Sequence, residues 1–500
     1  MKEPLMKYLS SKSLDYIGYS YIYNEFSPIT PYGIKEKSSL RLYKIGEEEE
    51  ISEVLSIVHS LKGLIEEDAK SFSSIELCLM EIKDITLVIN KLKEAICLDE
   101  VELFELKKQL IALVRLKKLW DNSPLKKVIS HLEFTDFTEP LKHLDPDKLS
   151  LPTFFIYDSY SERLKSIRER KKQLEKRLLA ETDTQHFQEL KAMRTIVVSE
   201  ELEEELRLRE ELTIKLQPFA LNIASNIKLL TELDIYLAKA RLALLSISTL
   251  PSIKKIGAPK LSGAINPFIE RQLQKRGLSF TPITIELEEG AAVITGANMG
   301  GKTVALKTLA LNILLVHLGF LPYCKDLQLS LLDYIYLNSE EAQDTSKSLS
   351  SFTGEILSLK EVLNYEEDHK GLLLLDEFAR GTNPQEGTIL CSSLTEYLRD
   401  KKIISVLATH YNGVAKKSSV HYQCIGLKKV SKETLNNSLI IGAASSQEII
   451  QSFMDYSLER VNNNLKVPEE ALKLCRLLDF NKEILAKASK EYNQGDFSYE

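Results

Sequence analysis

The chain has 500 residues, 44% of them hydrophobic, and carries a formal net charge of -7. This length allows about three domains with hydrophobic cores of their own, and the composition excludes a disordered chain. The acidic balance excludes a general basic field that would indicate a nucleic-acid partner, although a local basic patch stays compatible with it.

Six cysteines are scattered along the chain, without a Cys-x-x-Cys pair and without a histidine at metal-ligand spacing. This pattern is typical of thiols in a reducing cytosol. The first residues, MKEPLMKYLSSK, lack the apolar core of a secretory signal, and no apolar run approaches the length of a membrane span. We therefore expect a cytoplasmic protein without a membrane partner.

Residues 1–150 show helical periodicity, as in Leu103, Leu106, Leu110 and Leu113, and predict an all-helical domain. Residues 151–250 predict two long helical arms and a return helix over 222–245. The outgoing arm, SERLKSIRERKKQLEKRLLAE, is rich in Lys and Arg, whereas the returning arm, residues 200–216, is rich in Glu. The basic arm could bind nucleic acid, but the opposite charges favour pairing between the arms.

Residues 251–445 predict an α/β domain, because short β-like runs alternate there with helical patterns. Its central stretch is Ile294–Thr308, ITGANMGGKTVALKT, which fits the phosphate-binding pattern G-x-x-x-x-G-K-[ST]. The loop follows a strand-like run over 291–295 and precedes a helical run over 304–315. Backbone N–H groups and Lys302 would contact phosphates there, and the hydroxyl of Thr303 can ligate Mg²⁺.

Two further strands end in polar residues. The apolar run GLLLLDE, Gly371–Glu377, predicts a buried parallel strand whose Asp376 would hold Mg²⁺ and whose Glu377 would orient or deprotonate water. The strand over 403–408 is followed by Thr409 and His410, and this histidine can donate a hydrogen bond to a γ-phosphate or help position the water. Together with Lys302 and Thr303, these residues predict a Mg-ATP site.

A serine-rich stretch, SKSLSSFTGE over residues 346–355, precedes a helical pattern and predicts a capped helix N-terminus. Such an end binds anions. Because residues 296–303 already cradle the phosphates of this chain, the second anion-binding helix would serve the ATP of another subunit.

The combination of TGANMGGKT, SLSSFTGE, LLLLDEFARGTNPQEG and ATHY closely resembles the ATPase domain of the MutS-like DNA mismatch-repair family, within the ABC-type ATPases. The resemblance covers about residue 260 to the end strongly, and residues 27–245 more loosely as a helical core and lever. It implies an ABC-type α/β P-loop ATPase domain behind an all-α core and lever, with ATP and Mg²⁺ shared across a dimer. The dimer could be a homodimer or a heterodimer with a related subunit.

The resemblance also assigns roles to individual residues. The hydrolysis residues are Glu377, His410 and Lys302, and the Mg²⁺ ligands are Thr303 and Asp376. The residues matching nucleotide contacts are Gly296, Asn298, Gly300, Gly301, Lys302, Thr303, the signature residues Ser350, Ser351 and Gly354, and, for adenine, Phe280 and Ile283. The segments matching subunit contacts are Arg380–Gly387 and a helical dimerisation element over 446–500 that includes Ala471–Ala488.

Departures from the family pattern are expected as well. No mismatch-reading domain precedes the helical core, and the clamp at the end of the levers is reduced to little beyond residues 182–198. The small nuclease domain of the recombination-suppressing branch is absent, although SLSSFTGE is closest to that branch.

Three functions follow from these features. The first is a repair or recombination ATPase that grips branched or mismatched double-stranded DNA. The second is a chaperone-like ATPase that binds no DNA and reactivates an adenosylcobalamin-dependent enzyme, similar to the ATPase subunit of the lysine 5,6-aminomutase reactivating factor. The third, a paralog that does not hydrolyse ATP, is disfavoured because every catalytic position is filled.

Overall fold

A computed structural model describes residues 9–67, 69–147, 153–296, 301–338, 351–365, 369–426, 454–463, 475 and 480–494. The side chains of residues 69–71, 351 and 491–494 are outside this description. The chain divides into two compact units. Unit 1 comprises Met1–Phe26, Arg41–His59 and Lys239–Glu500, and unit 2 comprises Ser27–Leu40 and Ser60–Ala238.

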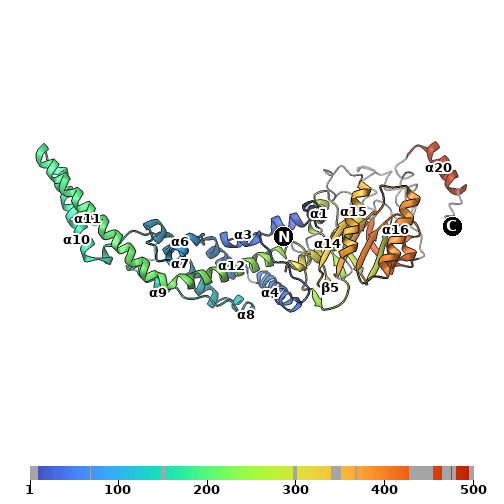
Figure 1. The fold of residues 1–500 in the computed structure, drawn as a ribbon, viewed down its shortest axis with the longest axis horizontal. Coiled ribbons are helices and arrows are strands. Elements are labelled where there is room, and N and C mark those ends of the chain that lie inside the picture. The colour runs from blue at the N-terminus through green and yellow to red at the C-terminus, as the bar shows by residue number, and fades with distance from the viewer. Residues whose placement is uncertain are drawn as a thin grey trace. The chain divides into compact units, whose positions relative to one another are not determined.

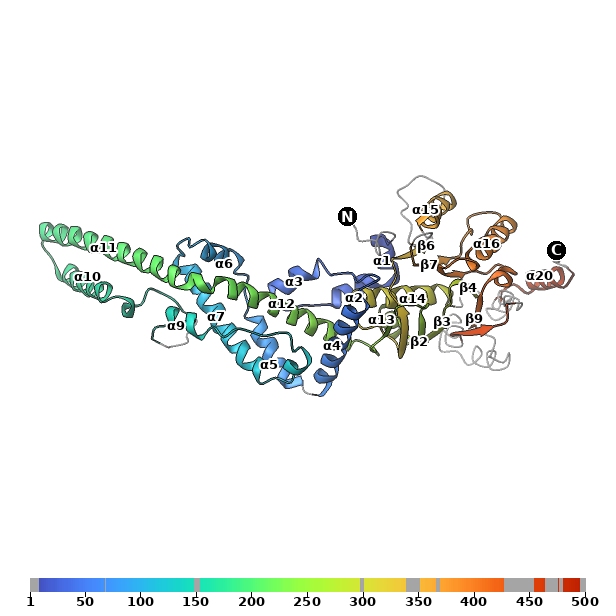
Figure 2. The ribbon, with the colours of Figure 1, turned by 60° about the horizontal axis from the view of Figure 1, so that its bottom comes forward.

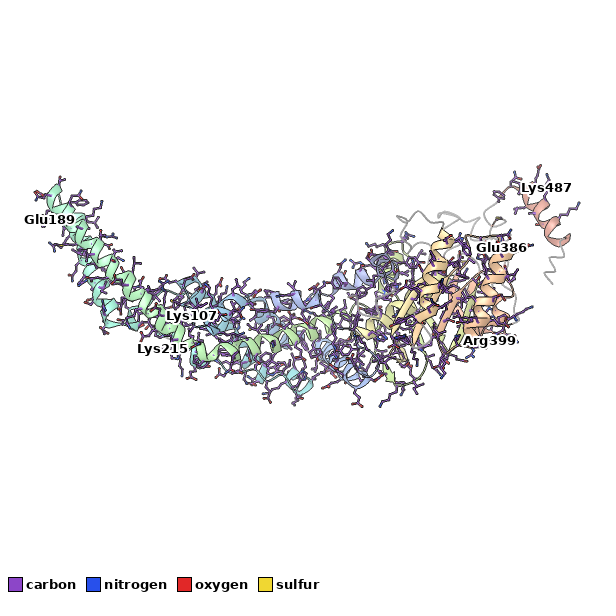
Figure 3. The ribbon with its side chains drawn as sticks, in the orientation of Figure 1. Lys107, Glu189, Lys215, Glu386, Arg399 and Lys487 are labelled. Atoms are coloured by element: carbon purple, nitrogen blue, oxygen red, sulfur yellow. The ribbon has the colours of Figure 1, made fainter. Side chains whose placement is uncertain are left out.

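The regular secondary structure described in unit 2 is all helical. Its helices, including α12, which ends in unit 1, are α3 (Pro31–Lys37), α5 (Ala69–Met80), α6 (Thr86–Lys93), α7 (Glu100–Asp121), α8 (Leu125–Val128), α9 (Thr138–Leu144), α10 (Glu162–Ala180), α11 (Thr184–Leu216) and α12 (Ala220–Leu242). Lys107 is fully buried in this unit and is labelled in Figure 3. Its ammonium group contacts Asp145 at 3.0 Å and the hydroxyl of Tyr157 at 3.0 Å, so the buried charge is compensated.

The predicted arms are α10 and α11, which lie side by side as a hairpin in Figures 1 and 2. The predicted charge pairing is confirmed. Arg168 on α10 contacts Glu201 at 3.1 Å and Glu205 at 2.8 Å on α11, and Arg194 on α11 contacts Glu175 on α10 at 2.8 Å. The second arm begins at Thr184, well before residue 200, because the carboxylate of Asp183 accepts from two backbone N–H groups and caps the helix.

Unit 1 contains two sheets and several helices. The helices are α1 (Ser11–Ile17), α2 (Tyr19–Glu25), α4 (Glu48–Glu67, which continues into unit 2), α13 (Pro267–Gln274), α14 (Lys302–His317), α15 (Ser351–Tyr365), α16 (Pro384–Arg399) and α20 (Lys482–Gln494). The strands are β1 (Ser252–Lys254), β2 (Lys260–Ala264), β3 (Ile283–Glu286), β4 (Gly290–Thr295), β5 (Asp326–Ser330), β6 (Tyr334–Asn338), β7 (Gly371–Asp376), β8 (Ile404–Ala408), β9 (Val420–Gly426) and β10 (Asp455–Val461).

The larger sheet has the strand order β10-β9-β4-β8-β7-β6, and all its neighbours are parallel except β9 and β10. The smaller sheet has the order β1-β5-β2-β3. Strands β4, β7 and β8 are apolar and buried on both faces, as expected for parallel strands covered by helices.

Helix α14 packs against strands of both sheets, which explains why it is buried nearly all round. Residues of α15 and α16, including Val362 and Leu398, join the hydrophobic core with strand residues such as Leu373. Figure 3 labels Glu386 and Arg399 at the two ends of α16. The covering helices hold the strand ends in place, and the candidate site is built there.

The prediction of a helical region followed by an α/β domain is confirmed. The division into 1–150, 151–250, 251–445 and 446–500 stays a prediction. Most of the predicted element over 471–488 lies outside the described residues, which include α20. No helix in the described ranges is both long and apolar enough to cross a membrane. All six cysteines are free thiols, and four of them are buried.

Candidate functional site

The register of the larger sheet brings three strand ends together. Ala408 at the end of β8 pairs with Ile294 of β4 on one side and with Asp376 of β7 on the other. The residues that follow these strands therefore emerge next to one another, at the carboxyl edge where α/β sheets bind ligands. The structure thus brings Lys302, Thr303, Asp376, Glu377 and His410 into one region.

The loop after β4 requires glycine at both described positions. Gly296 has φ +145°, and a Cβ there would lie 2.9 Å from the Cβ of Cys424. Gly301 has φ +89°, and a Cβ would lie 3.0 Å from the ring of Tyr456. Both the backbone angles and the close neighbours exclude larger residues. Asn298 and Gly300 lie outside the described residues, so their predicted contacts stay predictions.

Lys302 begins α14 and folds back over the loop. Its side chain is buried, and its ammonium group donates to the carbonyl oxygen of Gly296 at 2.8 Å. Burial lowers the pKa of Lys302, although Glu377 and Asp376 oppose this shift. The positive charge is therefore held inside the loop, at the start of a helix whose dipole also favours an anion.

One carboxylate oxygen of Asp376 accepts hydrogen bonds from two hydroxyl groups. The hydroxyl of Thr303 donates to Oδ2 at 2.8 Å, and the hydroxyl of Tyr16 donates to the same oxygen at 3.1 Å. Oδ1 is buried and has no hydrogen-bond partner among the described residues. Burial raises the pKa of Asp376, whereas the two hydroxyl groups oppose the rise. A buried carboxylate oxygen next to a threonine hydroxyl fits a hard divalent cation such as Mg²⁺.

Glu377 stands among basic side chains. Arg380 contacts its Oε2 at 2.7 Å, and Nδ1 of His410 lies 3.7 Å from its Oε1. The nearby His410 ring lowers the pKa of Glu377, and Lys302 and Arg380 act in the same direction. At 3.7 Å the ring is too far for a hydrogen bond, so its effect on the carboxylate is electrostatic. Glu377 is therefore ionised near neutral pH, as a base that orients water must be.

The backbone around Glu377 is strained. Glu377 has φ +53° and Ala379 has φ +62°, in the left-handed region that non-glycine residues rarely adopt. Three hydrogen bonds hold this turn: from Glu377 N–H to the Ala408 carbonyl at 2.9 Å, from the Tyr411 hydroxyl to the Ala379 carbonyl at 3.2 Å, and from Ala379 N–H to Glu355 at 3.3 Å. The surroundings thus fix the direction of the Glu377 side chain.

Sequence reasoning missed several residues of this network. Asn338 at the end of β6 donates to Glu355, and Glu355 in turn accepts from the turn after β7. Tyr411 is adjacent to His410, so its place after a strand was a usable signal. Tyr16 carries no local signal, because it lies 360 residues before Asp376.

For the remaining predicted residues, the described structure gives no contact with the residues above. Ser350 lies outside the described residues, and Ser351 begins α15 with a side chain that is not described. Gly354 has open space where a Cβ would lie. Phe280 is partly exposed, whereas Ile283 is only 3% exposed and packs within β3.

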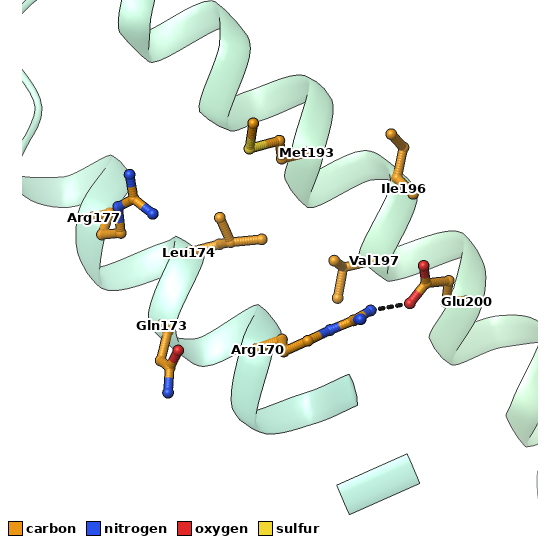
Figure 4. Close-up of a pocket in the computed structure, with 8 residues that line it drawn as sticks. All are labelled: Arg170, Gln173, Leu174, Arg177, Met193, Ile196, Val197 and Glu200. Atoms are coloured by element: carbon orange, nitrogen blue, oxygen red, sulfur yellow. Dashed lines mark hydrogen bonds and ion pairs between the residues drawn. The ribbon is translucent and has the colours of Figure 1, made fainter. Parts of the chain in front are cut away.

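A groove of about 380 Å³ lies between α10 and α11, the arms of unit 2. The residues described above belong to unit 1. Figure 4 shows apolar Leu174 and Met193 within the groove, and Arg170 paired with Glu200. Arg177 also lines it.

Residues 292–479 match the family model of MutS domain V, a range that contains β4, β7 and β8. The mixed α/β fold of unit 1 is consistent with this match. Fold and site therefore indicate that this part of the chain is similar to MutS domain V.

The chain is also similar to three proteins named Endonuclease MutS2. The relative from Carboxydothermus hydrogenoformans is 32% identical over 315 residues, which cover 57% of this chain and 38% of the relative. The relative from Halothermothrix orenii is 29% identical over 238 residues, 47% of this chain and 28% of the relative. The relative from Caldicellulosiruptor saccharolyticus is 34% identical over 219 residues, 43% of this chain and 27% of the relative.

Each alignment thus spans well under half of the relative's length. The domain match and these similarities thus show a likeness of parts of this chain to MutS-family proteins.

Proposed function

We propose that this chain binds and hydrolyses ATP with Mg²⁺, as an ABC-type P-loop ATPase of the MutS family. The observation that carries the proposal is the register of Ala408 against both Ile294 and Asp376. Because of this register, the loop after β4, the acidic pair and His410 follow adjacent strand ends, which supports the proposal. MutS-family proteins are ATPases, and this family inference supports the same reaction.

Bound ATP would supply the phosphoryl group, and Mg²⁺ would neutralise part of its charge. In this proposal the loop backbone and Lys302 hold the phosphates, while Thr303 and Asp376 hold the metal. Glu377 orients the attacking water and accepts its proton. His410, beside Glu377, donates toward the phosphoryl group or fixes the water.

The proposal includes a dimer, either a homodimer or a heterodimer with a related subunit. The start of α15, with Ser350, Ser351 and Gly354, would contact the nucleotide of the second subunit, and the loop Arg380–Gly387 would line the contact. Phe280 is the stronger candidate for adenine, because its ring is partly exposed, whereas Ile283 is buried.

DNA recombination or repair is the proposed role, because the relatives reported above are MutS2 proteins. Branched or mismatched double-stranded DNA is the proposed substrate, and the cytoplasm is the proposed location. The relatives give no support to the alternative of an ATPase that reactivates an aminomutase, and no contact in the described residues favours it.

The first test is ATP binding and Mg²⁺-dependent hydrolysis by the full chain. Lys302→Ala should weaken ATP binding about tenfold or more, the loss expected for a charge-assisted hydrogen bond. Lys417→Ala is the matched control, because Lys417 is partly exposed and pairs with Glu396. Unchanged ATP affinity in the Lys302 variant would contradict the assignment of the loop.

The second test addresses DNA. Binding of duplex, mismatched and four-way DNA is measured over a range of salt concentrations, with and without ATP. The proposal expects retention at low salt that weakens steeply as salt rises. Absence of binding to all three at low salt would remove the DNA role and leave the ATPase proposal standing.

A further inference from the structure

Tyr16 connects the N-terminal helix α1 to the acidic pair. Its hydroxyl donates to Oδ2 of Asp376 at 3.1 Å, next to the 2.8 Å hydrogen bond from Thr303. Both donors belong to unit 1. Tyr16 lies outside residues 292–479, so the match to MutS domain V assigns it no role.

The two hydroxyl groups leave the other carboxylate oxygen available. Oδ1 of Asp376 is buried and has no partner among the described residues, whereas Oδ2 accepts both hydrogen bonds. A carboxylate held on one oxygen cannot rotate freely, so Oδ1 keeps a fixed direction. Groups that orient a metal ligand in this way commonly tune the metal affinity.

Tyr16 is itself held in place by its neighbours. The ammonium group of Lys307 on α14 lies 3.5 Å from the centre of the Tyr16 ring, a cation–π contact. The next residue, Ile17, is fully buried, and its carbonyl oxygen accepts from the side chain of Asn266 at 2.9 Å. Helix α1 therefore presents the hydroxyl from a fixed position.

We propose that Tyr16 is a positioning residue of the Mg²⁺ site, which holds the carboxylate of Asp376 so that its free oxygen faces the metal of bound Mg-ATP. This inference rests on the proposed ATPase function. It adds a residue of α1, far from Asp376 in the sequence, to the proposed metal site. Tyr16 would act through Asp376 and would not touch the nucleotide.

The test compares Tyr16→Phe with Tyr21→Phe in the full chain. Tyr21 lies on α2, and its hydroxyl accepts from Arg271 at 2.8 Å, so the control loses the same group at another place. Binding of a fluorescent ATP analogue and ATP hydrolysis are measured during a Mg²⁺ titration, and binding is repeated in EDTA.

In Tyr16→Phe the half-saturating Mg²⁺ concentration should rise about tenfold, the low end of the range for such supporting groups. Saturating Mg²⁺ should restore most of kcat, and binding in EDTA should not change. Tyr21→Phe should behave as the unaltered protein does. This pattern would support the inference, because loss of general stability would not act through Mg²⁺ alone.

Tyr16→Ala distinguishes the hydroxyl from the ring. If the ring alone mattered, Tyr16→Phe would match the unaltered protein and only Tyr16→Ala would change, and this result would overturn the inference. Equal loss of binding with and without Mg²⁺ in Tyr16→Phe would overturn it as well. Absence of Mg²⁺-dependent nucleotide binding in the unaltered protein would instead refute the proposed function, before any variant is compared.

Discussion

Asp376 and Glu377 are consecutive carboxylates whose surroundings shift their pKa values in opposite directions. Burial raises the pKa of Asp376, whose hydrogen-bond donors are hydroxyl groups. The His410 ring, together with Lys302 and Arg380, lowers the pKa of Glu377. Such separation of neighbouring carboxyl groups commonly accompanies a division of roles. In the proposal above, Asp376 is the metal ligand and Glu377 is the residue that orients the water.

The role of Glu377 can be tested by Glu377→Gln. The amide cannot accept the proton of water, so turnover should fall by at least about a hundredfold, while ATP affinity should stay within about threefold. The variant should accumulate as an ATP-bound dimer, measurable by sedimentation with saturating ATP. The control is Glu396→Gln, outside the site. Near-normal turnover, or a monomer under saturating ATP, would contradict the proposed role.

A separate prediction concerns the effect of His317 on stability. It is the last residue of α14 and is fully buried, with Nδ1 donating to the carbonyl oxygen of Tyr43 at 2.9 Å. Burial lowers its pKa to about 4, from 6.5. Because the unfolded chain takes up this proton at higher pH, the free energy of unfolding should fall as pH drops from 6.5 to 4, by about 3 kcal/mol from this group.

His317→Gln removes the titrating group, so the loss of stability between pH 6.5 and 4 should become smaller by roughly this amount, even if the variant is less stable at pH 7. Urea unfolding at several pH values measures the difference. His59→Gln serves as the control, because His59 is exposed on α4. An unchanged pH dependence in His317→Gln would contradict the assignment.

At the scale of elements, the arms α10 and α11 illustrate why a basic helix need not be a nucleic-acid site. Arg168 and Arg194 are paired with carboxylates of the opposite arm. Lys172, Lys176 and Arg177 are exposed and make no ion pair with a described residue. If α10 contacts DNA, these three side chains are cations of that helix available for phosphate groups.

Replacing Lys172, Lys176 and Arg177 together by Ala should lower the slope of log affinity against log salt by about 2 to 3, since each lost phosphate contact contributes about 0.9. A control variant changes Lys126, Lys127 and Lys142, which are exposed on α8 and α9. DNA binding is measured by fluorescence anisotropy over a salt series. The same slope in both variants would exclude Lys172, Lys176 and Arg177 as phosphate contacts.

At the scale of the molecule, a shared ATP site would make activity depend on assembly. The serine-rich start of α15 is proposed to contact the nucleotide of a second subunit, so one subunit alone would lack part of the pocket. Turnover per molecule should therefore rise with protein concentration and level off as the dimer forms. Hydrolysis and sedimentation measured over the same dilution series test this. Constant turnover down to dissociated subunits would contradict the shared site.

Local sequence patterns predicted much of the α/β domain. The runs over 291–295, 371–377 and 403–408 match β4, β7 and β8 to within a residue at each end. The helix after the predicted phosphate loop was also predicted, over 304–315, and corresponds to α14. These features depend on continuous apolar runs, on glycine and on charge, which are visible within a few residues of sequence.

The sequence by itself thus determined which residues are proposed to carry the chemistry, because the predicted phosphate loop and the acidic pair are local motifs. Only the tertiary structure decided that β8 lies between β4 and β7, that α14 is buried nearly all round, and that Tyr16 reaches Asp376. It also decided the opposite pKa shifts of Asp376 and Glu377. The physical reason is that strand order, burial and the field at a carboxylate depend on groups far apart in the chain, which no local pattern records.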